Sequence, residues 1–361
     1  MVPAPCGSMA PVPPPAYQRA LAKHRSGLHL DALTVVETLH LLALCQLAAR
    51  LGRRGSPAAL PKGPGGVART YSDASLLLIA LLRTLWRLSL RDMHDWLVAW
   101  PALAAACGLP ADDRGRPRVP SPGTMSKRAA QAGAPPYEVL FVEAVRQALR
   151  ARLIGARDLI IDSAPIKAWR RADPDARYGH APAHHPTAFL QGFRLHTLLC
   201  RGSGLPVAFR LAPANQHDAP FARPLLALAV RLYGLRVRTV RLDAAYWGPA
   251  LIAWIHTALG AVAVIPWNPK RTKDRSCLPP TWTRAELGKR TSIERFFGRI
   301  MLFFRLQRPP LAGWTAVTQR AALTYTASIV VGLAAQHAGR PDLVRSPKRV
   351  LAHDWEGLLV S

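Results

Sequence analysis

An ordered series of apolar segments between Leu159 and Phe304 most strongly limits how this chain can fold. The first of them, 159–162, is apolar on both faces, which is typical of a strand in the middle of a sheet. The expected elements are, in chain order, a strand at 159–162, strands at 192–200 and 205–213 around a Gly-Ser-Gly turn, a helix at 218–233, a strand at 237–243, a helix at 248–259, a strand at 261–266, and helices at 291–304 and 321–335. A hairpin followed by alternating helices and strands predicts an α/β fold, a mixed sheet flanked by helices.

The part of the chain before this series shows helical periodicity. Helices are expected at 31–51, from Ser72 or Asp73 to Leu88, at 91–100, from Ser121 onward, and at 136–153. A segment rich in Gly, Pro and Arg separates the first of these helices from the second. We therefore divide the chain into a flexible, basic and proline-rich arm (1–30), an all-α region (31–155), the α/β domain (156–340) and a C-terminal tail (341–361).

The charge of the chain indicates its partner. The 361 residues include 48 Lys and Arg but 21 Asp and Glu, which gives a formal net charge of +27. Such a charge destabilises a compact protein by self-repulsion unless a polyanion is nearby, and nucleic acid is the natural polyanion. An acidic membrane surface is the other candidate, but no amphipathic basic helix stands out, so no membrane partner is expected.

Targeting and cofactor signals point to the cytoplasm, where DNA of the nucleoid is accessible. No signal peptide and no convincing membrane span are present, and 62–66 lacks the Lys-Ser/Thr of a phosphate-binding loop, so no nucleotide cofactor is expected. The cysteines are too scattered for a disulfide framework or a zinc site, which fits a reducing compartment. They are Cys6, Cys45, Cys107, Cys200 and Cys277.

Two aspartates lie where strands of the expected sheet end. Asp162 ends the first buried strand and Asp243 ends the strand at 237–243. If these strands are neighbours, both carboxylates emerge at one edge of the sheet. Phosphodiester cleavage by two metal ions needs such convergent oxygen ligands, because Mg²⁺ prefers oxygen. A lone aspartate at a strand end is more often a turn or cap residue, but the pair favours a metal site.

A third acid is needed, and Glu286 and Glu294 are the candidates. Each fits a capping box with a threonine three residues earlier, so spacing alone does not choose between them. Glu294 lies beside the apolar stripe of its helix, from which it could lean toward the sheet. Arg290 is one turn earlier on the same side, where it could hold the carboxylate or a DNA phosphate.

At these residues the chain resembles a known family. The motifs are Ile-Asp-Ser-Ala-Pro-Ile-Lys at 161–167, Asp-Ala-Ala-Tyr at 243–246 and Arg-Thr-Ser-Ile-Glu at 290–294, with Gly-Phe-Arg-Leu-His at 192–196 and Asn-Gln-His-Asp at 215–218 between them. In this order they resemble the insertion-sequence DDE transposases of bacteria and archaea. The resemblance implies a ribonuclease-H-like core, and the helical segment at 72–97 resembles the region that the family uses for DNA binding.

The resemblance also implies an activity. Asp162, Asp243 and Glu294 would be the catalytic, metal-binding triad, with Mg²⁺, or Mn²⁺ in its place, as the cofactor. Water would cleave the end of a mobile DNA element, and the freed 3′-hydroxyl would attack target DNA. The partners would be the transposon ends and target DNA, with a homodimer spanning two ends. The alternatives are a ribonuclease-H-like nuclease without strand transfer and a catalytically inactive, transposase-derived DNA-binding protein.

The sequence departs from some relatives of this family. Leu287 and Met301 stand where those relatives have a tyrosine and a lysine that handle DNA ends, so Arg299 or Arg305 would have to replace these contacts. The short spacing between the second and third acids leaves no room for the large β-rich insertion of some members. Basic side chains near the third acid, with Trp267 and Trp282 for stacking, favour a DNA-tracking groove. The candidate DNA-binding residues are Lys167, Lys270, Arg271, Lys273, Lys289, Arg290, Arg295 and Arg299.

Three further groups have simpler interpretations. His180, His184 and His185 lie in a proline-rich segment and are expected in a solvated loop instead of a metal site. Asp218 is expected to cap the helix that follows it, although it could instead shape the rim of the site with its neighbours. Tyr246 is expected to pack in the core beneath Asp243.

Overall fold

The computed structural model describes residues 70–155, 157–181, 187–268, 286, 288–337 and 339–351. The expectations for the arm at 1–30, the helix at 31–51 and the end of the tail therefore lie outside the described residues. The same holds for Lys270, Arg271 and Lys273, and for His184 and His185.

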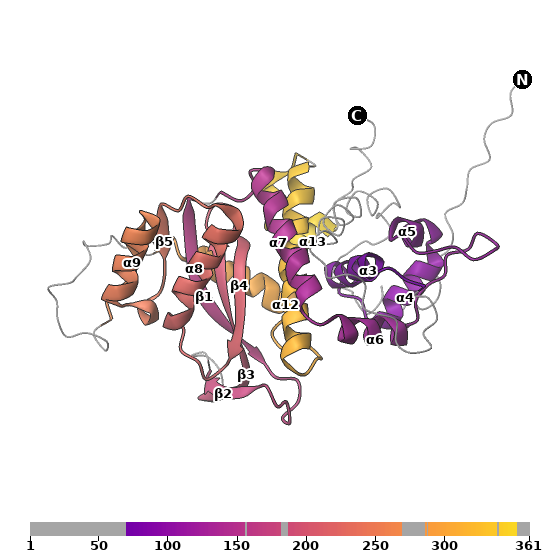
Figure 1. Ribbon diagram of the computed structural model, residues 1–361, viewed down its shortest axis with the longest axis horizontal. Helices are drawn as coiled ribbons and strands as arrows, with labels where there is room; N and C mark the ends of the chain where they lie inside the picture. Colours follow the sequence, from indigo (N-terminus) through magenta and orange to yellow (C-terminus); the bar gives the residue numbers. More distant parts are fainter. Residues whose placement is uncertain are drawn as a thin grey trace, which may run out of the picture.

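A six-stranded mixed sheet forms the centre of the α/β domain (Figure 1). Its strands are β1 Asp158–Lys167, β2 Arg177–His180, β3 Phe189–Cys200, β4 Leu205–Pro213, β5 Thr239–Arg241 and β6 Val262–Val264. The spatial order is β2-β3-β1-β5-β6, and β4 also pairs with β3. β1 is antiparallel to β3 but parallel to β5, and β5 is parallel to β6. A hairpin on one side of the first strand and two parallel strands on the other is the expected ribonuclease-H-like order.

The hairpin and the shortened strands have local causes. Gly204 has a φ of +66°, so the turn between β3 and β4 needs the one residue that adopts this conformation without strain. β5 and β6 contain three residues each, fewer than expected, because Asp243 already begins the short 3₁₀ turn η2, Ala244–Tyr246. The strand β2, for which the sequence showed no clear pattern, extends the sheet beyond β4 along β3.

Helices occur where serine caps predicted them. Ser72 accepts a hydrogen bond from the Ser75 amide, and Ser121 accepts one from the Thr124 amide. The helices are α3 Asp73–Leu85, α4 Leu90–Ala99, α5 Pro101–Ala106, α6 Pro122–Ala132, α7 Pro135–Arg150, α8 Ala219–Tyr233, α9 Pro249–Leu259, α11 Thr291–Gly298, α12 Trp314–His337 and α13 Pro347–Leu351, with a 3₁₀ turn η4 at Pro341–Leu343. None of the described helices is long and apolar enough to cross a membrane.

The helix expected at 291–304 is interrupted. α11 ends at Gly298 and continues as a π-helical turn, η3, at Arg299–Phe303. The capping box expected at Thr291 does not form, because Arg290 holds the N-cap position and no side chain caps the helix. Glu294 therefore makes no capping hydrogen bond, and its carboxylate lies 3.9 Å from the guanidinium of Arg290.

Two helical layers enclose the sheet, as Figure 1 shows. α8 packs on β3 and β4, while α7 and α12 pack on β4 from the other side. The ring of Tyr325 on α12 contacts Phe141 of α7, Phe209 of β4 and Phe296 of α11 at centroid distances of 6.0, 5.0 and 5.3 Å. α12 also packs on α3, so it joins the helical region to the domain.

One buried hydrogen bond in this core gives a test of the fold. The hydroxyl groups of Tyr325 and Thr197 are hydrogen-bonded, and both residues are fully buried. We expect Tyr325→Phe to lower the free energy of unfolding by ~1–3 kcal/mol, because the Thr197 hydroxyl would be left without a partner. Tyr233→Phe is the matched control, since the buried Tyr233 hydroxyl has no hydrogen-bond partner among the described residues. Denaturant unfolding that found equal losses for the two variants would contradict this packing.

Candidate active site

Asp162 was expected to end its strand, but β1 continues to Lys167, so Asp162 lies within the strand, on the face that α11 and α12 cover. It pairs with Thr197, whose hydroxyl reaches Tyr325 of α12, so the two side chains share this face. One carboxylate oxygen accepts a hydrogen bond of 2.8 Å from the Ser163 amide, and the other accepts one of 3.0 Å from Arg290. Burial raises the pKa of Asp162 to about 6, against the opposing effects of Arg290 and the Ser163 amide.

Asp243 reaches the same edge of the sheet from β5. Because β1 and β5 are parallel and Ile160 pairs with Arg241, the residues two positions further along both strands are also neighbours. One oxygen of Asp243 accepts a hydrogen bond of 2.8 Å from the Ala245 amide at the start of η2. The carboxylates of Asp162 and Asp243 are therefore each held by a backbone amide.

Arg290 brings the third acid to this pair. Its guanidinium lies 3.0 Å from Asp162, 3.9 Å from Asp243 and 3.9 Å from Glu294. Glu294 stands one turn later on α11, and its side chain is 62% exposed, whereas those of the two aspartates are 17% and 32% exposed. A single cationic group thus contacts all three acids that the family motifs indicate.

Glu286, the alternative third acid, has other partners. Its carboxylate binds Arg241 at 2.8 Å and also pairs with Lys289. These two hydrogen bonds, first that of Lys289 and then that of Arg241, lower the pKa of Glu286. Arg241 is buried and pairs with Asp158 as well. Glu286 therefore belongs to an ion-pair group around Arg241, and it is Glu294 that meets Arg290.

The acids fit a hard cation in their chemistry, and Arg290 shows where a cation is held. Carboxylate oxygens are the ligands that Mg²⁺ prefers. Within the described residues, however, no three His, Cys, Asp or Glu side chains lie close enough together to hold a metal ion as they stand. Asp162 and Asp243 could provide two ligands of such a site, and Glu294 could complete it only after its exposed side chain turns inward.

A polar group on the opposite face of β1 was not expected. Asp218 holds the N-cap position of α8, as expected, but its side chain makes no capping hydrogen bond and its backbone is already helical. It accepts hydrogen bonds from Ser163 at 2.7 Å and from Arg194 at 3.3 Å, and lies 3.6 Å from His196. Asp218 is therefore the N-cap residue by position, but its side chain binds Ser163 and Arg194 behind the site instead of capping the helix. One feature of the sequence could have predicted this polar group. Arg194 and His196 stand two residues apart in a largely apolar segment, so in a strand their side chains lie on the same face.

His196 shows how tightly this group is packed. The residue is fully buried, and its ring stacks on Phe221 of α8 at a centroid distance of 3.9 Å. Burial lowers the pKa of His196 to about 4, although Asp218 raises it. The imidazole is therefore neutral at neutral pH, and the positive charge facing Asp218 comes from Arg194.

The expected DNA-binding residues differ in whether their side chains are exposed or already bound to other parts of the protein. Lys167 is exposed at the end of β1, and Arg295 is exposed on α11. Lys289 pairs with Glu286, and Arg299 donates to the carbonyl of Gly204 while lying over the ring of Phe296. Arg290 contacts the triad. Of the described candidates, Lys167 and Arg295 have charges most open to a ligand.

Two other expectations concern single residues. Tyr246 is buried beneath Asp243, as expected, and burial raises the pKa of its hydroxyl well above the usual range. His180 lies in β2 instead of a loop, with its ring 4.9 Å from that of Phe189.

Because the pKa of Asp162 is raised, replacing its carboxylate with a neutral group should stabilise the protein in a pH-dependent way. The folded protein binds the Asp162 proton more tightly than the unfolded chain does, so this contribution to stability is present at low pH and is lost as pH rises through about 6. We expect Asp162→Asn to stabilise the metal-free protein by on the order of 2 kcal/mol above pH 6 and by little below pH 4. Melting temperatures in EDTA across this range measure the effect, with the exposed Asp113→Asn as control. A gain that does not depend on pH would contradict the assigned cause.

Comparison with known proteins identifies this domain. Residues 154–330 match the family model described as Transposase DDE domain, and this segment contains the whole sheet and all three acids. No curated protein shows significant similarity to the chain. A cryo-EM structure of a piggyBac transposase synaptic complex with hairpin DNA is similar with a TM-score of 0.45 and 8% identity, over 92% of this chain and 83% of that one. Residues 154–330 are thus a transposase DDE domain.

Proposed function

We propose that this transposase binds the ends of a mobile DNA element, cleaves them in a metal-dependent reaction and joins them to target DNA. The observation that supports the proposal is the meeting of Asp162, Asp243 and Glu294 at one guanidinium, that of Arg290. The three acids come from three separate elements, β1, β5 and α11, and they match the order of the family motifs. The net charge of +27 favours a DNA partner.

The acids would serve as the metal ligands. Asp162 and Asp243 would hold the ions with the oxygens that the backbone does not bind, and Glu294 would complete the set from α11. Divalent ions in such a site lower the pKa of water and stabilise the charge on the attacking and leaving oxygens. We take Mg²⁺ as the ion, with Mn²⁺ as a substitute, because every donor is a carboxylate oxygen.

The residues of the chain orient this reaction. The amides of Ser163 and Ala245 each fix one oxygen of an aspartate, so the outward oxygen of each has a set direction. Arg290 carries a planar fork of donors that matches a phosphate as well as it matches carboxylates. With DNA bound, we expect this guanidinium to pair with a backbone phosphate beside the scissile bond.

The chemistry needs no nucleotide and no covalent enzyme intermediate. Attack of water on the phosphodiester at the element end leaves a 3′-hydroxyl and a 5′-phosphate. Attack of that 3′-hydroxyl on target DNA then exchanges one phosphodiester for another. A homodimer holding two ends would allow both to be joined at one target site.

Cleavage assays with matched acid variants test this proposal. The substrate is labelled DNA carrying the inverted repeats that flank the coding sequence, with Mg²⁺ or EDTA. We expect Asp243→Asn and Glu294→Gln to retain DNA binding but lose cleavage by roughly 100-fold or more, because ligand loss removes several kcal/mol of charge stabilisation. Glu286→Gln is the control and should cleave nearly as the wild type does.

Each outcome separates one alternative. Cleavage that survives in Glu294→Gln but is lost in Glu286→Gln would move the third acid to Glu286. Cleavage without strand-transfer products from a paired-end substrate would leave a nuclease. Tight binding with no cleavage by the wild-type protein would leave a DNA-binding protein derived from a transposase.

A further inference from the structure

Four arginines gather where the helical region meets the α/β domain. We call them the junction arginine cluster, and they are Arg83 of α3, Arg87 after α3, Arg305 after η3 and Arg320 of α12. Arg320 donates to the hydroxyl of Thr84 at 3.1 Å and to the carbonyl of Phe304 at 2.8 Å. Arg87 lies over the ring of Phe303, 4.4 Å from its centroid. These contacts fix two of the four guanidiniums across the junction.

No acid neutralises this cluster in the described part of the chain. None of the four arginines forms an ion pair there, and the buried Nε atoms of Arg83 and Arg87 have no hydrogen-bond partner. Burial, followed by the charges of Arg83 and Arg305, lowers the pKa of Arg320 to about 10. Burial and then Arg305 lower the pKa of Arg87. Four like charges at one junction repel one another, so the site favours an anion.

Backbone conformation gives a second, independent observation. Arg87 and Arg305 have φ angles of 58° and 56°, in the left-handed region that favours glycine. Arg87 follows α3 in a Schellman turn, in which the Leu88 amide bonds to the Arg83 carbonyl, and glycine is the usual residue at such a position. Two long cationic side chains thus occupy strained positions on facing turns, and strain of this kind is concentrated at functional sites.

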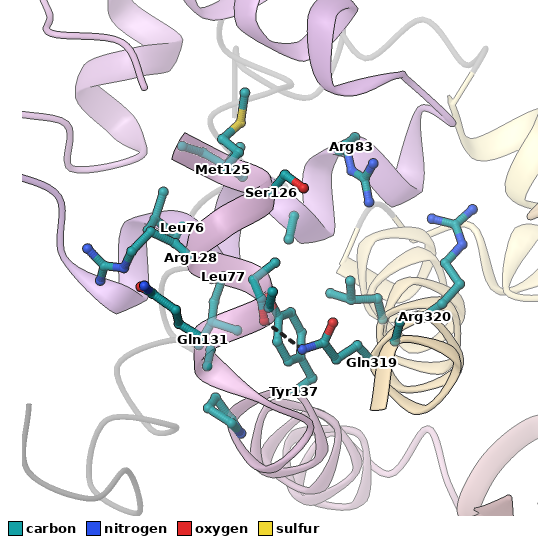
Figure 2. Close-up of a pocket in the computed structure, with 18 of the residues that line it drawn as sticks. Leu76, Leu77, Arg83, Met125, Ser126, Arg128, Gln131, Tyr137, Gln319 and Arg320 are labelled. Carbon is teal, nitrogen blue, oxygen red and sulfur yellow. Dashed lines mark hydrogen bonds between the residues drawn. The ribbon is translucent and has the colours of Figure 1, made fainter. Parts of the chain in front are cut away.

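Free space lies beside the cluster. A cavity of about 360 Å³ between α3, α6, α7 and α12 is lined by Arg83 and Arg320. Figure 2 shows these two side chains reaching toward one another from α3 and α12 at one side of the cavity. Arg128, which also lines the cavity, is already paired with Asp73. An anion could therefore approach Arg83 and Arg320 without displacing a protein carboxylate.

The cluster is close enough to the three acids for one DNA strand to contact both. Residues 294–303 form the rest of α11 and the turn η3, and Arg305 follows two residues later. At a helical rise of about 1.5 Å per residue this segment spans roughly 15 Å. With one phosphate per strand every 3.4 Å or so along the DNA axis, this corresponds to roughly four to five nucleotides. A strand whose phosphodiester lies at the triad can reach the cluster along α11 and η3.

We propose that the junction arginine cluster binds the phosphodiester backbone of DNA a few nucleotides from the cleavage site. Guanidinium groups match phosphate oxygens with two parallel hydrogen bonds, and a DNA strand supplies repeating charges that can neutralise several arginines at once. The proposal rests on the proposed function in one respect, which is that the chain binds DNA. It does not depend on the metal site or on strand transfer.

The salt dependence of DNA binding tests this site. Binding of the full chain to a labelled duplex of arbitrary sequence is measured in EDTA by fluorescence anisotropy at several salt concentrations. Each lost phosphate contact should reduce the slope of log K against log salt by about 0.9, so we expect the double variant Arg87→Gln/Arg305→Gln to reduce it by roughly 1.8. Arg152→Gln is the matched control, because Arg152 is exposed, follows α7 in the same kind of turn and has a φ of 56°. Its slope should stay near that of the wild type.

Two further variants separate binding from folding. Arg87→Lys/Arg305→Lys keeps the charges and should keep most of the slope. Arg87→Gly/Arg305→Gly relieves the left-handed strain, so it should raise the melting temperature while it reduces the slope. A slope that is unchanged in the glutamine and glycine variants would overturn this site while leaving DNA binding intact. No DNA binding by the wild-type protein would overturn the proposed function together with the site.

Discussion

The attraction between the Arg290 guanidinium and three carboxylates is the interaction on which the arrangement of the site depends. Asp162 and Asp243 are brought together by parallel pairing of β1 and β5, which is a property of the sheet alone. α11 is not part of the sheet, and it contributes both Glu294 and, at its N-cap, Arg290. The apolar side of α11 buries Ile293 and Phe296, which sets its distance from the sheet, and the ion pairs of Arg290 direct its polar side toward the aspartates. Packing and charge therefore act on opposite sides of the same short helix.

Burying a carboxylate at this site has an electrostatic cost, which the raised pKa of Asp162 records. The polar group behind β1 limits how the strand can respond. Ser163 donates its amide to Asp162 on one face and its hydroxyl to Asp218 on the other, so a single residue connects the site to α8. Arg194 of β3 donates a hydrogen bond to Asp218, and the neutral His196 beside it stacks on Phe221 of α8. The direction of the Asp162 carboxylate thus depends on contacts on both faces of the sheet.

The sequence predicted helices and strands well where a single local pattern specified each of them. It predicted the roles of single residues less well where one local pattern fitted more than one role. The hairpin and the alternation of strands and helices follow from apolar runs. The strand-end argument for Asp162 and Asp243 was only half right, because Asp243 follows the end of β5, whereas β1 continues past Asp162 to Lys167. The choice between Glu286 and Glu294 did not follow, because both fit a capping box, and only the partners Arg241 and Arg290 distinguish them. The side-chain partners of Asp218 were missed for a similar reason. An aspartate before Ala-Pro at a helix start predicts an N-cap, and Asp218 holds that position, but its side chain binds residues 55 and 24 positions away in the chain.

The composition of the chain explains why many of its arginines have no acidic partner. With 48 basic and 21 acidic residues, the chain cannot neutralise itself, and the acids it has are concentrated in a few groups such as the triad and the Arg241 group. Repulsion in the junction arginine cluster and strain at Arg87 and Arg305 both make the DNA-free protein less stable than its packing allows. A ligand that binds the folded state alone stabilises it in proportion to the logarithm of its concentration. DNA bound at the cluster would therefore stabilise the contact between the helical region and the α/β domain, which would couple DNA binding to the position of α11 through η3.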